Sequence, residues 1–508
     1  MIATRYYVTT AIPFVNAEPH LGHALELVQA DVLARHRRLR GQQVRFLTGT
    51  DDNALKNVTA ARAAGVDVGA FVDTNAERFA ALRGPLDVLT DDFIRTSGAR
   101  HRAGVHRLWR RCAARGDFYR HTYEGRYCAG CEEFLDDGDL VAGRCPEHDA
   151  VPETVSETNW FFRLSRYQDQ VLDAIASNRV RIVPQARRNE VLGFVRSGLR
   201  DFSVSRPVQR SGAWGIAVPD DPSQIIYVWW DALANYVTAL GYGDDQTDYR
   251  HWWRDGDERV HVIGKGILRF HAVHWLALLL AAGEPLPTHI AVHDYLTVDG
   301  AKLSKSAGNG IHPLDLVQRY GVDAVRWWLL REVATLGETD FTVDRLVRRA
   351  DADLAGRLGN LVNRVVTLVE KYRDGRVPAA ADAGEHGQRL AAAAHDVAGD
   401  VDAALARYDF RAAIAAIWRL VDGGNALVEQ SRPWELARAE RAGDVAAAAA
   451  LDAVLAALIA ACRRAAAELS PFIPSGAERL QRQLGCGDTV APASPVFLRR
   501  AGPLAVES

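Results

Sequence analysis

Two histidines lie three residues apart where an expected loop meets an expected helix. The segment reads His20-Leu21-Gly22-His23 and follows the turn AIPFVNAEP. Backbone N–H groups and the positive end of the helix dipole favour anions at a helix start, and both imidazoles can reach the same anion. The pair indicates a phosphate site. Without other evidence, however, two histidines near a helix start more often have no such function.

Two lysines, Lys302 and Lys305, lie in the turn TVDGAKLSKSAGN much later in the chain. Small neighbours on both sides favour a loop that closes over a triphosphate. Of 61 basic residues only five are lysines, namely Lys56, Lys265, Lys302, Lys305 and Lys371. Since arginine serves almost everywhere that positive charge suffices, a retained lysine indicates a site that needs a compact ammonium. This scarcity favours a phosphate-binding loop over an ordinary solvated turn.

Four metal-ligating side chains form a compact pattern of CxxC, a thirteen-residue gap and CxxH: Cys128, Cys131, Cys145 and His148. This spacing is typical of a tetrahedral zinc site. The six cysteines of the chain are too few and too unevenly spaced for a disulfide framework. The cysteines therefore predict zinc and a reducing, cytoplasmic compartment.

Alternating strands and helices must position these groups. A strand at 5–10 precedes an amphipathic helix, and a second strand at 44–47 ends at TGTDD. Parallel sheets bind ligands at that carboxyl edge. Short aromatic strands around the cysteines interrupt this pattern, after which buried parallel strands at 225–228 and 261–264 and a helix at 270–280 are expected.

Length and charge limit the remaining choices. A chain of 508 residues is expected to form two or more domains. The net charge of −3 excludes a globally basic surface, so any nucleic-acid contact must be local. The N-terminus does not read as a signal peptide. The apolar segment 445–462 is mostly alanine and contains Asp452, so we expect a packed helix and no membrane span.

HLGH and KLSKS match the HIGH and KMSKS signatures of class I aminoacyl-tRNA synthetases, in that order. Further segments resemble methionyl-tRNA synthetases over essentially the whole chain: AIPFVNAEPHLGHALE, FLTGTDDNALK, NWFFRLSRY, GLRDFSVSR, YVWWDALANY, HVIGKGILRFH, LTVDGAKLSKSAGN, LGNLVNR and RPWELA. The resemblance implies an α/β fold in which a Rossmann-type domain is split by a zinc-knuckle insertion and followed by an α-helical bundle that binds the anticodon. The expected ranges are 1–116 and 225–290 for the two Rossmann halves, 117–224 for the insertion, 291–343 for the KMSKS-loop and stem-contact region, and 344–508 for the bundle.

The resemblance also implies roles for individual residues. Phosphate chemistry falls to His20, His23, Lys302 and Lys305. Further nucleotide contacts fall to Gly22, Glu26, Gly264 and Ser306. The amino-acid pocket takes Ile12, Phe14, Asp51, Trp229, Ala232, Tyr236, Ile267, Phe270 and His271, with Asp51 on the substrate ammonium. The knuckle cysteines and His148 hold a structural zinc, and the anticodon is read by Asn360, Arg364 and Trp434.

Three departures from the family fall near the expected ligands. The family usually has tyrosine at Phe14, an acid at Gly266 and a glutamate-histidine-glycine run where this chain has Asp52-Asn53-Ala54. Sites built on hydrogen bonds discriminate between substrates better than apolar ones do. These changes therefore bear on the choice of amino acid more than on activation chemistry.

In the expected reaction, methionine reacts with ATP and Mg²⁺ to give methionyl-adenylate and pyrophosphate. Methionine is then transferred to the 3′ end of tRNA(Met). No DNA or membrane partner is expected. One alternative is a paralogue that activates another amino acid for tRNA-independent ligation in biosynthesis, which the pocket departures favour and the anticodon residues oppose. Another is a non-catalytic RNA-binding or assembly protein, which the retained histidines and lysines oppose. A leucyl, isoleucyl or valyl enzyme is disfavoured because the insertion is too short for an editing domain.

Overall fold

The computed structural model describes residues 4–128, 133–135, 137–146, 149–244, 247–302, 310–379 and 381–499. The chain divides into two compact units. The first comprises residues 1–84, 88–294 and 304–311, and the second comprises residues 85–87, 295–303 and 312–508. A parallel sheet in the first unit and a helical second unit confirm the expected mixed α/β class.

A six-stranded parallel sheet organises the first unit, in the order β3-β2-β1-β12-β13-β7. Every residue of β1 after Arg5 is buried, as expected for a parallel strand covered on both faces. After β1, the strands β2 and β3 are added on one side of the sheet, whereas β12 and β13 are added on the other side, so the direction of strand addition reverses between β1 and β12. Ligands bind at the carboxyl ends of strands around such a reversal. The strands are β1 (Arg5–Thr10), β2 (Gln43–Thr50), β3 (Asp92–Arg95), β7 (Arg181–Val183), β12 (Glu258–Gly264) and β13 (His289–His293).

Helices cover this sheet and connect its strands. The α-helices of the first unit are α1 (Leu21–Leu39), α2 (Leu55–Ala64), α3 (Val68–Ala81), α4 (Ala99–Ala114), α5 (Gln168–Ala176), α6 (Gln185–Arg196), α7 (Val208–Ser211), α8 (Val228–Leu233), α9 (Asn235–Thr238), α10 (Thr247–Tyr249) and α11 (Trp275–Ala282). Short 3₁₀ turns span Asp137–Asp139, Leu164–Tyr167, Tyr242–Asp244 and Lys265–Ile267, and π-helical turns span Arg250–Arg254 and Phe270–His274.

Two small antiparallel sheets occupy the segment around the cysteines. Their orders are β5-β4-β6-β8 and β10-β11-β9. The strands are β4 (Phe118–Cys128), β5 (Glu133–Leu135), β6 (Glu153–Phe162), β8 (Phe202–Ser203), β9 (Ser205–Pro207), β10 (Ala217–Val218) and β11 (Asp221–Ile226).

The prediction of a parallel strand at 225–228 is wrong. Ile225 and Ile226 belong to β11, which pairs antiparallel with β9, and Val228 already begins α8. A short buried apolar run reads the same in either kind of sheet, because burial and not strand direction determines its composition. The parallel sheet instead gains β7 from within the range where the insertion was expected.

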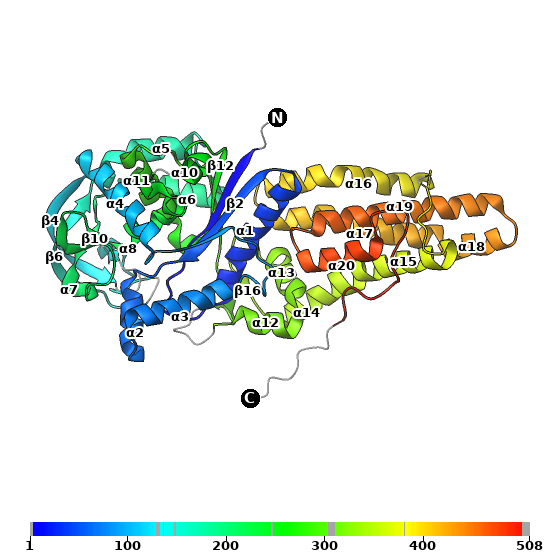
Figure 1. The fold of residues 1–508 in the computed structure, drawn as a ribbon, viewed down its shortest axis with the longest axis horizontal. Helices are drawn as coiled ribbons and strands as arrows, with labels where there is room; N and C mark the ends of the chain where they lie inside the picture. The colour runs from blue at the N-terminus through cyan, green and yellow to red at the C-terminus, as the bar shows by residue number, and fades with distance from the viewer. Residues whose placement is uncertain are drawn as a thin grey trace. The chain divides into compact units, whose positions relative to one another are not determined.

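The second unit is mainly helical. Its helices are α12 (Pro313–Tyr320), α13 (Val322–Arg331), α14 (Val343–Ala350), a π-helix (Asp351–Gly359), α15 (Asn360–Arg373), α16 (Gly384–Leu405), α17 (Phe410–Ser431), α18 (Pro433–Arg441), α19 (Val445–Leu469) and α20 (Pro474–Leu484). The strands β14 (Leu296–Val298), β15 (Ala301–Lys302) and β16 (Thr339–Asp340) form its one described sheet. Figure 1 shows α16, α17 and α19 running side by side, and these helices pack together.

One described helix, α19, is long and apolar enough to cross a membrane by length and composition. It packs against α15, α16, α17, α18 and α20, and 56% of its most apolar stretch is buried within the protein. The prediction that 445–462 forms a packed helix is therefore confirmed.

Candidate active site

The two histidines of the HLGH segment stand at the first turn of α1. The Nδ1 atom of His20 accepts a hydrogen bond from the Gly22 N–H at 3.1 Å, and the Nδ1 atom of His23 accepts one from the His20 N–H at 3.0 Å. An Nδ1 that accepts an N–H bond carries no proton, so the proton of each neutral ring lies on Nε2. The rings stack with centroids 3.8 Å apart. The helix start therefore presents two Nε2–H donors beside its own positive dipole end.

Gly22 permits this arrangement through its small size. A Cβ atom at residue 22 would lie 2.9 Å from Cε1 of His20, so a larger residue there would push the His20 ring out of its present position. The His20 ring can fold back to cap the helix because no side chain stands there. The expected nucleotide-binding role of Gly22 thus has a structural counterpart in the positioning of His20.

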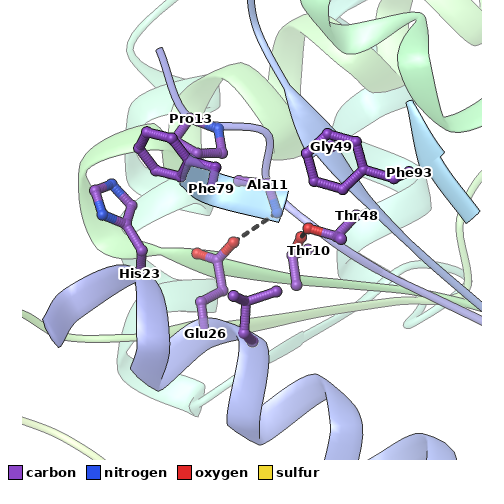
Figure 2. A pocket seen from close by; sticks show the side chains of 10 residues that line it. Thr10, Ala11, Pro13, His23, Glu26, Thr48, Gly49, Phe79 and Phe93 are labelled. Carbon is purple, nitrogen blue, oxygen red and sulfur yellow. Dashed lines mark hydrogen bonds between the residues drawn. The ribbon is translucent and has the colours of Figure 1, made fainter. Parts of the chain in front are cut away.

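A pocket opens between α1 and the carboxyl ends of β1 and β2 (Figure 2). Glu26 and His23 project into it from α1, and the Oε1 atom of Glu26 accepts a hydrogen bond from the Ala11 N–H at 2.7 Å. Two expected ligand-binding residues therefore meet at this edge of the sheet. The lining consists of Thr10, Ala11, Pro13, His23, Glu26, Leu27, Thr48, Gly49, Phe79 and Phe93.

Glu26 has a second partner, His293, which the sequence analysis missed. The Nε2 atom of His293 lies 3.1 Å from the Glu26 Oε2, and its Nδ1 atom lies 3.0 Å from the Asp294 carbonyl oxygen. Burial lowers the pKa of His293, but the Glu26 carboxylate raises it, and the net pKa lies above the ordinary value of 6.5. His293 pairs in the sheet with Gly264, another expected nucleotide contact. Its position at the end of a parallel strand was the one signal in the sequence that pointed to it.

Three aromatic residues of the expected amino-acid pocket form one cluster. Trp229 and Phe270 stack with centroids 3.7 Å apart, and Phe14 meets Trp229 edge-on at 6.0 Å. Such rings offer an apolar, polarizable surface that suits a thioether. Ala232 is buried on α8, the helix that carries Trp229, whereas Ile12 packs against the main hydrophobic core.

Tyr236, His271 and Ile267 form a short hydrogen-bonded chain. The Nδ1 atom of His271 lies 2.9 Å from the Ile267 carbonyl oxygen, and its Nε2 atom lies 2.6 Å from the Tyr236 hydroxyl. Burial lowers the pKa of His271 to about 4, so the ring is neutral near pH 7. Because a carbonyl only accepts, His271 donates from Nδ1 and accepts the Tyr236 hydroxyl proton at Nε2.

Asp51 lies directly after β2 and is almost fully buried. Its backbone N–H donates to the Pro13 carbonyl at 2.9 Å, next to Phe14. Its Oδ1 atom accepts hydrogen bonds from the Asn53 N–H at 3.2 Å and from the Thr96 hydroxyl at 3.3 Å. The carboxylate is therefore held in place near the aromatic cluster by two donors.

Several expected site residues fall partly or wholly outside the described residues. The backbone of Lys302 lies in β15, opposite Thr297, but its side chain is not described. Lys305 and Ser306 lie outside the described ranges, as do Cys131 and His148. Cys128 and Cys145 are both buried. Among the residues that the structure describes, no group of three or more metal-ligating side chains comes together.

The expected anticodon residues lie in the second unit. Asn360 and Arg364 are four residues apart in α15, so they share one helix face. Trp434 lies in α18 with 42% of its side chain exposed, which is unusual for a large aromatic residue in this chain.

Comparisons with known proteins identify the family. The model of the family described as "tRNA synthetases class I (M)" matches residues 6–151 and 147–366. The chain is 39% identical to the methionine–tRNA ligase of Caldanaerobacter subterraneus subsp. tengcongensis, covering 94% of this chain and 74% of that protein. It is 41% identical to the Thermosynechococcus vestitus methionine–tRNA ligase, covering 95% of this chain and 90% of that one.

Solved structures agree with these relatives. Methionyl-tRNA synthetase of Mycobacterium tuberculosis in complex with methionyl-adenylate superposes with a TM-score of 0.92 at 38% identity, covering 98% of this chain and 100% of that one. The same enzyme in its free state gives a TM-score of 0.86 at 35% identity, covering 99% of each chain. With two histidines presented at the start of α1 and this similarity over nearly its full length, the chain belongs to the methionyl group of class I aminoacyl-tRNA synthetases.

Proposed function

We propose that this protein is a methionine–tRNA ligase, which forms methionyl-adenylate from methionine and ATP and then transfers methionine to the 3′ end of tRNA(Met). The observation that carries the proposal is the pair of Nε2–H donors, His20 and His23, at the start of α1. His23 lines a pocket at the carboxyl edge of the sheet, and His20 stacks on His23, so a triphosphate there would meet both the positive end of the helix dipole and imidazole N–H donors.

In the activation step, the substrate carboxylate attacks the α-phosphorus of ATP. The new carboxyl–phosphorus bond forms as the bond to the β-phosphate breaks and pyrophosphate leaves. The carboxylate is already a nucleophile, so no general base is needed. Catalysis then consists of alignment and stabilisation of negative charge on the phosphates. His20, His23, Lys302 and Lys305 supply that charge stabilisation, and Mg²⁺ enters bound to ATP.

The neighbouring residues hold the two substrates. Glu26, Gly22, Gly264 and Ser306 contact the nucleotide. Asp51 receives the ammonium of the amino acid. The methionine side chain would then lie among Ile12, Phe14, Trp229, Ala232, Tyr236, Ile267, Phe270 and His271. The Tyr236 hydroxyl proton is already engaged by His271, and Phe14 has no hydroxyl, so the pocket recognises the thioether mainly through ring contacts.

We also propose a structural zinc held by Cys128, Cys131, Cys145 and His148. Cys128 ends β4, and Cys145 sits in a tight turn closed by bonds from Asp149 N–H to the Cys145 carbonyl and from Cys145 N–H to the Ala150 carbonyl. Buried thiols that carry no catalytic duty fit a closed four-ligand site. Zinc bound there would stabilise the local fold without taking part in the reaction.

The tRNA is read in the second unit. Asn360, Arg364 and the exposed Trp434 are the proposed anticodon contacts, because unpaired bases stack on exposed aromatic rings and bind to polar side chains. The reaction takes place in the cytoplasm, where tRNA and ATP are available. The proposed domain limits remain those expected from the sequence: 1–116 and 225–290 for the Rossmann halves, 117–224 for the insertion, 291–343 for the loop region and 344–508 for the bundle.

An ATP–pyrophosphate exchange screen with each of the twenty amino acids tests this proposal. We expect methionine to give the highest kcat/KM. A second candidate, a paralogue that activates another amino acid, is favoured by Phe14, Gly266 and Asn53. A clear preference for an amino acid other than methionine would replace the first proposal by the second.

A further inference from the structure

Asn53 lies between two buried carboxylates, those of Asp231 and Asp51. Asp231 sits on α8 with its side chain fully buried. Its Oδ1 atom lies 3.1 Å from Nε2 of His101, and its Oδ2 atom accepts a hydrogen bond from Nδ2 of Asn53 at 2.9 Å. A buried carboxylate is costly unless donors compensate for its lost hydration. Asn53 therefore provides one of the donors that keep Asp231 in place.

The same asparagine reaches Asp51 along two routes. Its backbone N–H donates directly to the Asp51 Oδ1 at 3.2 Å. Its Nδ2 also donates to the Thr96 carbonyl at 3.1 Å, and the Thr96 hydroxyl donates to that Asp51 Oδ1 at 3.3 Å. Residue 53 thus contacts Asp51 directly through its backbone and indirectly through Thr96.

The chemistry of the side chain explains why asparagine suits this place. One amide nitrogen carries two hydrogens, and here one goes to the Thr96 carbonyl and the other to the Asp231 carboxylate. An ionised aspartate of the same shape has no hydrogen to donate and would set a second negative charge against Asp231. Residue 53 belongs to the Asp52-Asn53-Ala54 run, where the resemblance implies a different sequence in the family.

We propose that Asn53 is a positioning residue for the amino-acid substrate, which anchors Asp51 to the buried Asp231–His101 pair so that the Asp51 carboxylate meets the substrate ammonium. This inference rests on the proposed role of Asp51. Asn53 itself is not among the proposed substrate-binding or phosphate-binding residues. Its loss therefore weakens recognition of the ammonium and leaves the chemical step unaltered.

The test compares Asn53→Ala and the isosteric Asn53→Asp with the wild-type enzyme. In pyrophosphate exchange we expect the KM for methionine to rise about tenfold, as for loss of one hydrogen bond to a charged group. The kcat and the KM for ATP should stay within about twofold of the wild-type values, a change well below the expected rise in the KM for methionine. Calorimetry with 4-(methylthio)butanoate, which lacks the ammonium, should give the same dissociation constant for all variants.

Two further variants make the result decisive. Asn159→Ala removes a buried asparagine whose Nδ2 donates to Glu157 at 3.0 Å in the insertion, and it should leave the KM for methionine unchanged. Asp51→Asn tests the proposed function itself. If Asp51→Asn leaves the KM for methionine unchanged, the role of Asp51 fails. Two outcomes would overturn the positioning role of Asn53 alone, given that Asp51→Asn raises the KM for methionine. In the first, both Asn53 variants leave that KM unchanged. In the second, they weaken binding of 4-(methylthio)butanoate as much as binding of methionine.

Discussion

At the scale of residues, hydrogen bonds from the backbone determine which nitrogen of each site histidine carries the proton. The Nδ1 atoms of His20 and His23 accept backbone N–H bonds, which leaves Nε2 as the donor on each ring. The sequence predicted that the pair lies at a helix start, which α1 confirms, and its phosphate role stays a prediction. It could not predict the protonated nitrogen, because that depends on the cap geometry of α1.

This geometry predicts different outcomes for two substitutions of His23. His23→Gln places an amide donor close to the Nε2 position, whereas His23→Asn can replace only the Nδ1 acceptor. Loss of a donor to developing charge costs on the order of 10²–10³ in kcat. We expect that loss for His23→Asn in pyrophosphate exchange and a clearly smaller one for His23→Gln. Equal losses in the two variants would contradict the assignment of Nε2 as the donor.

The His293–Glu26 pair predicts a dependence of stability on pH. The net pKa of His293 in the folded chain lies above the ordinary 6.5, although burial lowers it, because Glu26 raises it more. The charged pair therefore stabilises the fold fully below pH 6.5, and this contribution is lost as pH rises through the folded pKa. Thermal unfolding of wild type and His293→Gln, measured from about pH 5.5 to about pH 8.5 around that ordinary value, should show a difference that shrinks as pH rises. A difference that stays constant would mean that the pair is not titrating.

Contacts between distant segments account for the site residues that the sequence analysis missed. Glu26 and His293 are separated by 267 residues, and Asn53 and Asp231 by 178. Neither pair leaves a local pattern, since each depends on the order of strands and helices around the sheet.

At the scale of elements, local periodicity predicted strands and helices better than it predicted strand partners. The strand predicted at 5–10 is β1, and the helix expected to begin at HLGH is α1, which runs from Leu21 to Leu39. The run at 225–228 was read as parallel although β11 is antiparallel, and β7, with three residues, is too short to show a period. Direction and pairing depend on the fold as a whole.

The zinc knuckle is an element whose metal can be measured directly. We expect one tightly bound zinc per chain, because four-ligand sites couple metal binding to local folding. Elemental analysis after dialysis should find zinc in the wild type and in the control Cys486→Ser, whose cysteine is exposed and lies outside the motif. Cys131→Ser should lose it. Wild-type protein without zinc, or a Cys131→Ser variant that retains it, would refute the site.

At the scale of the whole molecule, the proposed anticodon residues fall in the second of the two compact units. Apart from Lys302 in β15, the proposed substrate-binding residues that the structure describes lie in the first unit, while the proposed anticodon residues Asn360, Arg364 and Trp434 lie in the second. Changes at the three proposed anticodon residues should therefore affect tRNA charging without affecting adenylate formation.

Trp434→Ala tests this separation. Loss of a stacking platform costs about 1–3 kcal/mol per base, which corresponds to roughly a tenfold to hundredfold fall in kcat/KM for tRNA. Pyrophosphate exchange should be nearly unchanged. Val445→Ala, at an exposed apolar residue of the same unit, serves as the control and should alter neither reaction. Equal loss of exchange and charging in Trp434→Ala would indicate general damage and not a lost anticodon contact.

Attachment of methionine to tRNA is the measurement that tests the central claim most directly. Wild-type protein is incubated with ATP, Mg²⁺, labelled methionine and tRNA(Met), and the label on acid-precipitated tRNA is counted. We expect efficient charging that is lost when the terminal ribose is oxidised with periodate and that falls sharply when the anticodon is changed. Adenylate formation from methionine or another amino acid without any charging of tRNA would contradict it and favour tRNA-independent ligation.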